Sequence, residues 1–307
     1  MGIVRSVLLA GSENRWLRDH ATRWRFVRSA VSRFMPGETA EAALDATRAL
    51  GVGTVLTQLG ENVRDLDQAR GVTGHYLDVL DRVHRDGLDV EVSIKLTQLG
   101  LDLSREECEK NLLTLIERAR SLSNWIWIDM EGTAYTDVTL DMARRARAGK
   151  PNVGVCVQAY LYRTAEDMKS LIALGSGIRL VKGAYREPPD KAFPKKSDVD
   201  ENYFRLAEQL LSADARAKGV RAIFGTHDPI LIRRIEDLGQ SSNLPREALE
   251  FQMLYGIRRQ EQERIAKAGY KFRVLISYGD AWFPWYMRRL AERPANVLFV
   301  LKNLFAR

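Results

Sequence analysis

The chain lacks the features that mark a secreted, metal-binding or membrane-spanning protein. Its 307 residues include two cysteines, Cys108 and Cys156, and no Cys-x-x-Cys pair, so neither a disulfide framework nor a structural zinc site is indicated. We expect both cysteines to be reduced and buried. The four histidines are scattered, which argues against a catalytic metal. No apolar run approaches the roughly 20 residues of a membrane span, and residues 7–10 are too short for a secretory signal, so we expect a cytoplasmic protein.

Positive charge exceeds negative charge, with 47 Lys and Arg against 40 Asp and Glu and a net charge of +7. This excess permits attraction to nucleic acid, anionic lipid or acidic substrates, without choosing among them. Basic and aromatic residues interleave over residues 15–28, within a predicted N-terminal helical arm at residues 1–45. Such an arm could lie on a membrane surface or contact nucleic acid. A solvated face is the favoured interpretation, because no nucleic-acid-binding motif accompanies it.

Short β-branched runs alternate with helical stretches along the rest of the chain. The eight predicted strands cover residues 52–57, 90–95, 125–129, 153–158, 178–182, 221–226, 249–253 and 272–276. Between them, apolar residues recur at helical spacing, as in residues 108–122 and 203–218. This order indicates an α/β fold, a (β/α)8 barrel over residues 46–307, within one domain of residues 1–307. A long loop at residues 187–200 follows the fifth strand.

A doubly wound open sheet is the alternative fold with the same element order. It would carry a dinucleotide-binding turn of the form Gly-x-Gly-x-x-Gly after its first strand. That turn is missing here, so the barrel is favoured.

Polar side chains close the predicted strands, at the end where barrel enzymes assemble their sites. They are Thr57, Lys95, Asp129, Gln158, Lys182, Thr226, His227, Gln252, Tyr255 and Tyr278. Lys95 and Asp129 end neighbouring strands and could pair, so that the aspartate orients the ammonium beside a substrate carboxylate. Arg179 or Lys182 brings positive charge toward an anionic or electron-accepting ligand.

Neutral groups on the later strands suit a heteroaromatic ligand. Gln158, Thr226 and His227 supply donors and acceptors for such a ring and its phosphate tail. Gly183 lets the backbone approach a ligand closely, and Tyr185 offers a ring to cover it.

Two adjacent arginines, Arg288 and Arg289, follow a cluster of aromatic residues on a predicted helix. Both side chains are long enough to bend toward one planar anion over the helix face, and a carboxylate is the natural ligand. Glu292, at i+4 and i+3 from the two arginines, offers an alternative in which it neutralises both on a surface helix.

Seven segments, taken in order, resemble the proline dehydrogenase family in its short, single-function bacterial form. They are Ser93-Ile94-Lys95-Leu96, Asp129-Met130-Glu131, Gln158-Ala159-Tyr160, Arg179 to Tyr185, Thr226-His227, Glu250-Phe251-Gln252 and Tyr286 to Leu290. The resemblance implies FAD-dependent oxidation of L-proline to 1-pyrroline-5-carboxylate, with electrons passed to a membrane quinone. It also implies a distorted barrel whose eighth helix lies over the C-terminal ends of the strands.

The resemblance also implies a role for individual residues. Arg288, Arg289 and Lys95 would bind the proline carboxylate, with Asp129 supporting Lys95 and Arg179 approaching the flavin near N5. The implied cofactor contacts are Met130, Gln158, Arg179, Lys182, Gly183, Ala184, Thr226 and His227.

The same resemblance assigns the walls and the gate of the substrate pocket. Tyr185 and Tyr278 would form its walls, and Glu61 would pair with the first arginine and help to close the site. The sequence departs from the family at Leu275 and Ser277, where tyrosine and proline are common. This departure leaves the preference for proline over hydroxyproline open.

Two other classes of function stay open on the residues alone. Lys95 or Lys182, each closing a barrel strand, could attack a carbonyl in a Schiff-base aldolase. A nucleic-acid-binding protein is supported only by the basic arm, and we expect no nucleic-acid partner. The resemblance favours the flavoenzyme, with peripheral contact between its basic surface and anionic lipid at the inner face of the cytoplasmic membrane.

Overall fold

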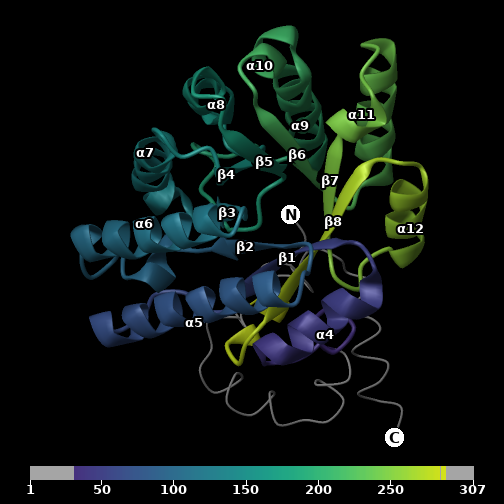
Figure 1. Ribbon diagram of the computed structural model, residues 1–307. Coiled ribbons are helices and arrows are strands. Elements are labelled where there is room, and N and C mark those ends of the chain that lie inside the picture. The colour runs from purple at the N-terminus through teal and green to yellow at the C-terminus, as the bar shows by residue number, and fades with distance from the viewer. Residues whose placement is uncertain (1–30, 284, 288–307) are drawn as a thin grey trace, which may run out of the picture.

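Eight parallel strands close a barrel in sequence order in the computed structural model, which describes residues 31–283 and 285–287 (Figure 1). β1 pairs with β2 on one side and with β8 on the other, which closes the ring. The strands are β1 (Gly53–Gln58), β2 (Val90–Ile94), β3 (Ile126–Ile128), β4 (Val153–Gln158), β5 (Gly177–Val181), β6 (Arg221–Gly225), β7 (Glu250–Leu254) and β8 (Lys271–Tyr278). The predicted (β/α)8 barrel is confirmed, and an open sheet is ruled out. β8 runs two residues beyond its predicted end.

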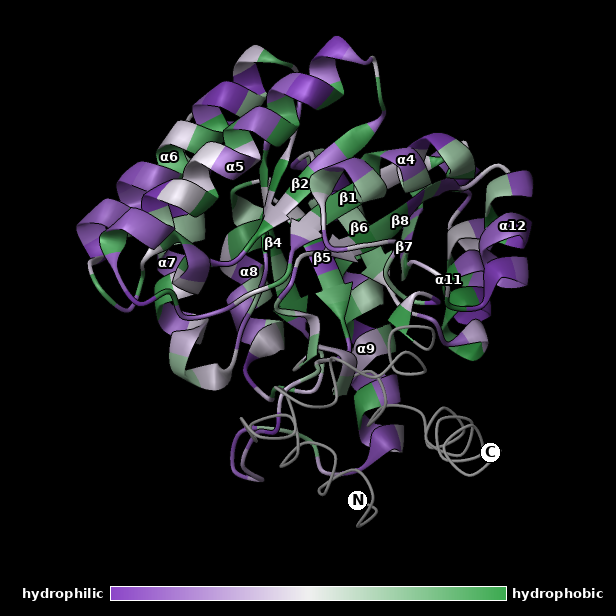
Figure 2. Cartoon of the chain, turned by 90° about the horizontal axis from the view of Figure 1, so that it is seen from below, coloured by the Kyte–Doolittle hydropathy of each residue, from purple (hydrophilic) through white to green (hydrophobic). Residues whose placement is uncertain are grey.

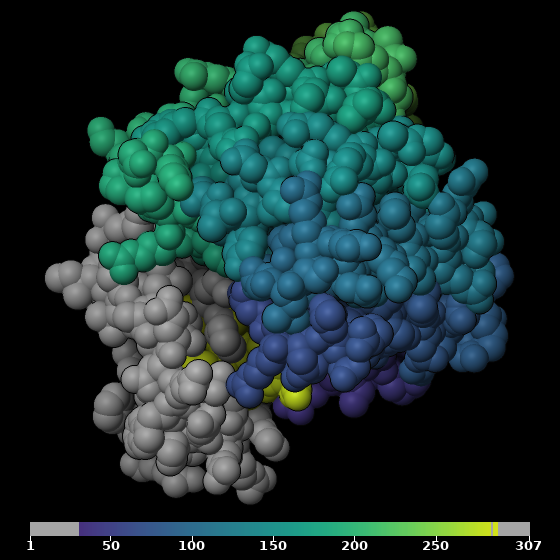
Figure 3. Space-filling model, turned by 90° about the vertical axis from the view of Figure 1, so that its left-hand side faces the viewer, coloured from purple at the N-terminus to yellow at the C-terminus, as the bar shows by residue number. Residues whose placement is uncertain are grey.

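Helices surround the barrel and form a continuous surface on the side that carries α5 to α7 (Figure 3). They are α4 (Ala40–Leu50), α5 (Leu66–Arg85), α6 (Arg105–Ser121), α7 (Thr136–Arg147), α8 (Thr164–Ala173), α9 (Lys196–Leu211), α10 (Ala213–Ala217), α11 (Pro229–Ser241) and α12 (Arg259–Lys267). Short 3-10 turns are η1 (Leu96–Leu99), η2 (Thr133–Tyr135) and η3 (Arg246–Ala248). Thr39, Asp65 and Ser104 each accept a backbone N–H from three residues on, which fixes where α4, α5 and α6 begin. No helix in the described ranges is long and apolar enough to cross a bilayer.

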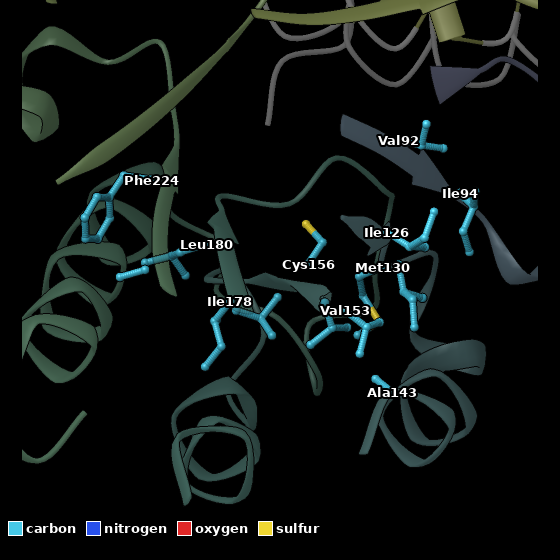
Figure 4. Close-up of a cluster of buried hydrophobic side chains, with 14 of the residues drawn as sticks. Val92, Ile94, Ile126, Met130, Ala143, Val153, Cys156, Ile178, Leu180 and Phe224 are labelled. Atoms are coloured by element: carbon cyan, nitrogen blue, oxygen red, sulfur yellow. The ribbon is translucent and has the colours of Figure 1, made fainter. Parts of the chain in front are cut away.

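The main hydrophobic core lies between the barrel and the ring of helices. Outward-facing strand residues are apolar, while the exposed faces of the outer helices are hydrophilic (Figure 2). In Figure 4, Ile126, Met130 and Val153 lie together beside Ala143 of α7. Cys108 and Cys156 are free and buried, as predicted.

The inside of the barrel is filled by a second, smaller apolar cluster. Val55, Trp127 and Ile223 form it, and the partly buried Leu275 packs against it. The indole of Trp127 fits because β4 offers a glycine beside it. A Cβ on Gly154 would lie only 2.2 Å from the Trp127 ring, so a larger residue there would displace the indole.

Charged side chains close the N-terminal end of the barrel and form what we call the ionic floor: the buried Glu91 and Glu250 and the partly buried Arg221 and Arg273. Arg221 lies 2.8 Å from Glu91 and donates two hydrogen bonds of 2.9 Å to Glu250. Arg273 lies 3.4 Å from Glu91 and 3.5 Å from Glu250. Glu91 also accepts a 2.7 Å hydrogen bond from the indole N–H of Trp127. Since barrel enzymes work at the opposite end, this network serves the stability of the fold.

The first and last described segments pack together. Val31 and Met35 form one buried cluster with Trp282, Tyr286 and Leu59. Leu59 directly follows β1, so residues 282–283 and 285–287 lie at the C-terminal end of that strand. The rest of the predicted last helix lies outside the described residues. Residues 1–30 of the predicted arm lie outside the described residues.

Candidate active site

An ion pair between the buried Arg179 and the partly buried Asp129 occupies the centre of the barrel near the C-terminal ends of its strands. The guanidinium of Arg179, on the inner face of β5, is only 2% exposed. It donates 2.6 Å hydrogen bonds to Oδ1 of Asp129 and to Oγ of Ser93, and a 3.3 Å bond to Oε1 of Gln252. Its charge also lies 5.4 Å from the ring centroid of Trp127. The arginine is therefore fixed in place by partners on three other strands or strand ends.

The partner of Asp129 differs from the one that the sequence suggested. Asp129 pairs with Arg179 and not with Lys95, which makes no ion pair within 4 Å in the described part of the chain. The reason is geometric: β4, between β3 and β5, presents Gly154 and Cys156 inward, and these small side chains leave room for the long arginine to cross. Lys95 is buried at the end of β2, with its charge left for another anion.

A second buried carboxyl group, Glu131, was not assigned a role from the sequence. It is 3% exposed and follows Asp129 by two residues. Its carboxylate accepts hydrogen bonds from the backbone N–H (3.2 Å) and the hydroxyl (2.7 Å) of Thr97. Burial raises the pKa of Glu131 to about 7, against the opposing effects of Thr97 and the nearby Lys95. The available signal was its spacing from Asp129, which puts both carboxyls beyond the same strand end.

Lys182, just beyond β5, is held by two carboxylates. Its ammonium donates to Asp200 of α9 and, at 2.8 Å, to Asp228. Asp228 in turn caps α11 by accepting the backbone N–H of Ile230 at 3.1 Å. Burial alone would raise the pKa of Asp228, but the hydrogen bond from Lys182 and its charge lower that pKa to about 2. Lys182 is thus anchored to the start of two helices beside the barrel mouth.

The loop after β5 reaches the loop after β1. Gly183 has a φ of +112°, and a Cβ there would lie 2.2 Å from the ring of Tyr160, so only glycine fits. The partly buried Ala184 follows it. The hydroxyl of Tyr185 then donates a 3.2 Å hydrogen bond to Oε1 of Glu61. The predicted gate residue and the predicted pocket wall are therefore in contact.

The same loop is also anchored to the loop after β3. Glu187 accepts a 2.8 Å hydrogen bond from the backbone N–H of Thr133 and a second one from its hydroxyl. Thr133 is the first residue of η2. The β5–α9 loop thus joins two other loops at the C-terminal side of the barrel.

Polar groups from β4, β6 and β8 complete the mouth. Nε2 of His227 accepts the backbone N–H of Leu254 at 2.9 Å, so this ring carries its proton on Nδ1 when neutral. Thr226 is buried beside it. Oε1 of Gln158 and Oγ of Ser277 are buried without a hydrogen-bond partner in the described residues. Each such orphaned atom costs about 1–3 kcal/mol, so the mouth fits a ligand that offers polar atoms to them.

The structure does not bring every predicted residue to the mouth. The side chain of Met130 belongs to the core beneath the helices (Figure 4), and only its backbone carbonyl faces Gln158, at 3.5 Å. Leu275 packs on the apolar cluster inside the barrel. Arg288 and Arg289 lie outside the described residues.

Tyr278 points away from the mouth, which corrects its expected place in a pocket wall. Its ring is fully buried in the outer core, and its hydroxyl shares a 2.7 Å hydrogen bond with Nε2 of His75 on α5. Side chains alternate along a strand. Because Leu275 faces inward, Ser277 also faces inward and Tyr278 faces the helices.

We expect Tyr278→Phe to change stability and not substrate binding. Losing the hydrogen bond to His75 should lower the free energy of unfolding by about 1 kcal/mol. The Michaelis constant should stay within about twofold of the parent value, a change below about 0.5 kcal/mol, because Tyr278 faces the helices and not the mouth. Urea unfolding and steady-state kinetics measure the two quantities. A large rise in the Michaelis constant with unchanged stability would put Tyr278 back in the pocket wall.

A family model and individual related proteins all indicate the same family for this chain. The sequence model of the proline dehydrogenase family matches residues 40–302. Proline dehydrogenase 1 of Bacillus subtilis (strain 168) is 36% identical over 306 residues, which cover 98% of this chain and 99% of that protein. Proline dehydrogenase of Deinococcus radiodurans is 37% identical over 282 residues, covering 89% of each chain.

Solved structures share the fold. Proline utilization A from Bdellovibrio bacteriovorus superposes with a TM-score of 0.79 at 24% identity. The match covers 94% of this chain and 36% of that longer one. At this identity, the likeness supports the barrel architecture and nothing finer.

Proposed function

Because the chain belongs to the proline dehydrogenase family, we propose that it oxidises L-proline to 1-pyrroline-5-carboxylate with FAD as its cofactor. This reaction is the first step of proline catabolism. We take residues 1–307 as one catalytic domain. The observation that most directly supports the chemistry is the Asp129–Arg179 pair, in which a carboxylate holds a buried guanidinium below the barrel mouth.

The described residues suit a flavin. Gln158 and Ser277 each present an orphaned buried oxygen at the mouth, and a heteroaromatic ring system with several donors and acceptors would satisfy such atoms. Thr226, His227, Lys182, Gly183 and Ala184, with the backbone of Met130, would hold the cofactor. When bound there, FAD supplies the two-electron acceptor for the hydride that leaves C5 of proline.

The protein's own part in the reaction is to bind and orient. Lys95, at the end of β2, makes no ion pair within 4 Å in the described residues and would bind the proline carboxylate together with Arg288 and Arg289. Asp129 keeps the guanidinium of Arg179 oriented, so that its positive charge stabilises electron density that develops nearby. Glu61 and Tyr185, joined by a hydrogen bond, would close the mouth and exclude water.

The proposal is tested by an absorption spectrum taken before and after anaerobic addition of proline. We expect a yellow protein whose visible bands bleach with proline and return when an acceptor is added. An aldolase would instead give a lysine adduct on borohydride trapping with substrate. Lys182 argues against that alternative, because its Nζ is held by two carboxylates and is not free to attack a carbonyl. A colourless protein that associates with DNA or RNA in a steeply salt-dependent manner would contradict the proposed function.

We propose a membrane quinone as the electron acceptor, reached by a cytoplasmic enzyme in peripheral contact with the membrane. The net charge of +7 supports this, because anionic lipid attracts basic proteins. Reoxidation of the reduced enzyme by a soluble quinone should be much faster than by oxygen. Flotation with vesicles that contain phosphatidylserine should retain the protein at low salt and release it at high salt. No flotation at any salt concentration would contradict the membrane contact.

We expect Arg288→Met and Arg289→Met to raise the Michaelis constant for proline by about 10- to 100-fold each, since a hydrogen bond between charged groups is worth about 1.5–3 kcal/mol. Both variants should keep their flavin. Arg259→Met, at an exposed position on α12, serves as the matched control and should leave the constant unchanged. Unaltered constants in both variants would contradict the role of the two arginines.

A further inference from the structure

Glu131 lies near two charged groups of the proposed substrate site, with no ion pair to Lys95 within 4 Å. Lys95 is close enough to stabilise its ionised form, and the carboxylate of Glu61 is close enough to oppose ionisation. Two more titratable groups face it from the neighbouring elements, Cys108 on α6 and Tyr135 in η2. Burial raises the pKa of the Cys108 thiol to about 12, and it raises the pKa of the partly buried Tyr135 as well. Both therefore stay neutral near pH 7, so among the described residues Lys95 and Glu61 are the charged groups that act on Glu131.

The carboxylate of Glu131 also fixes the backbone that carries Lys95. It accepts both hydrogen-bonding groups of Thr97, in the first turn of η1. Lys95 immediately precedes η1, and its carbonyl accepts the backbone N–H of Gln98 at 3.1 Å. Gln98 is tied in turn to the carbonyl of Gln58 on β1 at 3.1 Å. Lys95 has no capping bond of its own, so its position depends on this turn.

We propose that Glu131 is a positioning residue for the substrate carboxylate: it holds the turn that carries Lys95, and its own charge competes with the substrate for the Lys95 ammonium. The inference rests on the proposed function, because it takes proline as the ligand of Lys95. It gives Glu131 a role in setting the affinity of the site for the substrate carboxylate.

The direction of the pH dependence follows from this competition. Below pH 7 Glu131 is protonated, and Lys95 offers its full charge to an anionic ligand. As the pH rises through about 7, Glu131 ionises and partly neutralises Lys95, so affinity for the ligand falls. By linkage, a tenfold loss of affinity across this titration means that the bound ligand raises the pKa of Glu131 by one unit.

The test uses tetrahydrofuran-2-carboxylate, which is proline with oxygen in place of the ring nitrogen. This probe keeps the carboxylate but has no amine to titrate and no step to catalyse. Its dissociation constant from the flavin-loaded enzyme is measured by calorimetry as a function of pH. We expect the constant to rise on the order of tenfold between about pH 6 and about pH 8, with a midpoint near the pKa of Glu131.

Two variants separate this role from a merely structural one. Glu131→Gln keeps an oxygen for Thr97 but cannot ionise. The rise of the dissociation constant with pH, called the pH step below, should therefore disappear. Thr97→Val removes the hydroxyl that favours the ionised form, so the step should move to higher pH. Glu187→Gln is the matched control, because Glu187 accepts the same two groups of Thr133; its pH step should stay where it is in the parent enzyme.

The outcomes are distinct. A pH step that survives in Glu131→Gln, or a uniform loss of affinity at every pH with the step in place, would overturn the inference. Failure of the parent enzyme to bind the probe at any pH would instead count against the proposed substrate site.

Discussion

Replacing Asp129 with alanine is expected to lower the free energy of unfolding by about 3–5 kcal/mol, because it leaves a buried arginine without its counter-charge. The guanidinium of Arg179 is 2% exposed and loses its 2.6 Å partner. Ser93 and Gln252 remain as neutral acceptors and cannot balance a full charge. The same change should lower kcat, because Arg179 is no longer held in one orientation. Urea unfolding at constant m-value measures the stability loss.

Two further variants define the cause. Asp137 pairs with Arg163 at the same 2.6 Å distance, but its side chain is 83% exposed. Asp137→Ala should therefore cost at most about 1 kcal/mol. Asp129→Asn keeps an acceptor for Arg179 and should fall between the two. An equal loss at Asp129 and Asp137 would show that burial of the Arg179 pair carries no special weight.

Replacing Glu91 with alanine is expected to destabilise the protein by a similar amount, about 3–5 kcal/mol. The change removes one of the two carboxylates between Arg221 and Arg273 and leaves the indole N–H of Trp127 unpaired. Unlike Asp129, Glu91 lies at the N-terminal end of the barrel. The folded Glu91→Ala enzyme should therefore keep the parental Michaelis constant for proline.

Glu91→Gln is the matched variant for this second prediction. It retains an oxygen that can accept from Trp127 but loses the charge, so it should be less destabilised than Glu91→Ala. Denaturant unfolding and steady-state kinetics on the same preparations measure both effects. If Glu91→Ala left stability unchanged while weakening proline binding, the ionic floor would have to be reassigned as part of the site.

The fold was predictable because the residues of each strand form a recognisable local pattern. Runs such as residues 153–158 are β-branched and bounded by turn residues, and this pattern requires no knowledge of distant contacts. The closure of the ring is a different matter. β1 and β8 pair over six positions, although more than two hundred residues separate them, and only the count of eight strands indicated it.

The site was predictable where a residue's face could be counted along its strand. Asp129, Gln158 and Arg179 all face the barrel interior, as residues at alternating positions must. Tyr278 failed this test because the predicted strand stopped at Ile276. Once β8 extends to Tyr278, counting from Leu275 turns that tyrosine outward.

Contacts across the barrel could not be counted in this way. The partner of Asp129 was expected on the neighbouring β2, since adjacent strands are the nearest neighbours that chain order reveals. Arg179 reaches it from β5 instead. The contact depends on the length of the Arg179 side chain and on the small side chains that β4 presents inward. Neither can be recognised when each strand is considered by itself.

The ionic floor and Trp127 leave the lumen of the barrel blocked at one end. In an enzyme of the proposed activity, the substrate therefore has to approach from the opposite end, where the strands finish. The closed base restricts access to one side of the barrel, although none of its residues takes a direct part in the reaction.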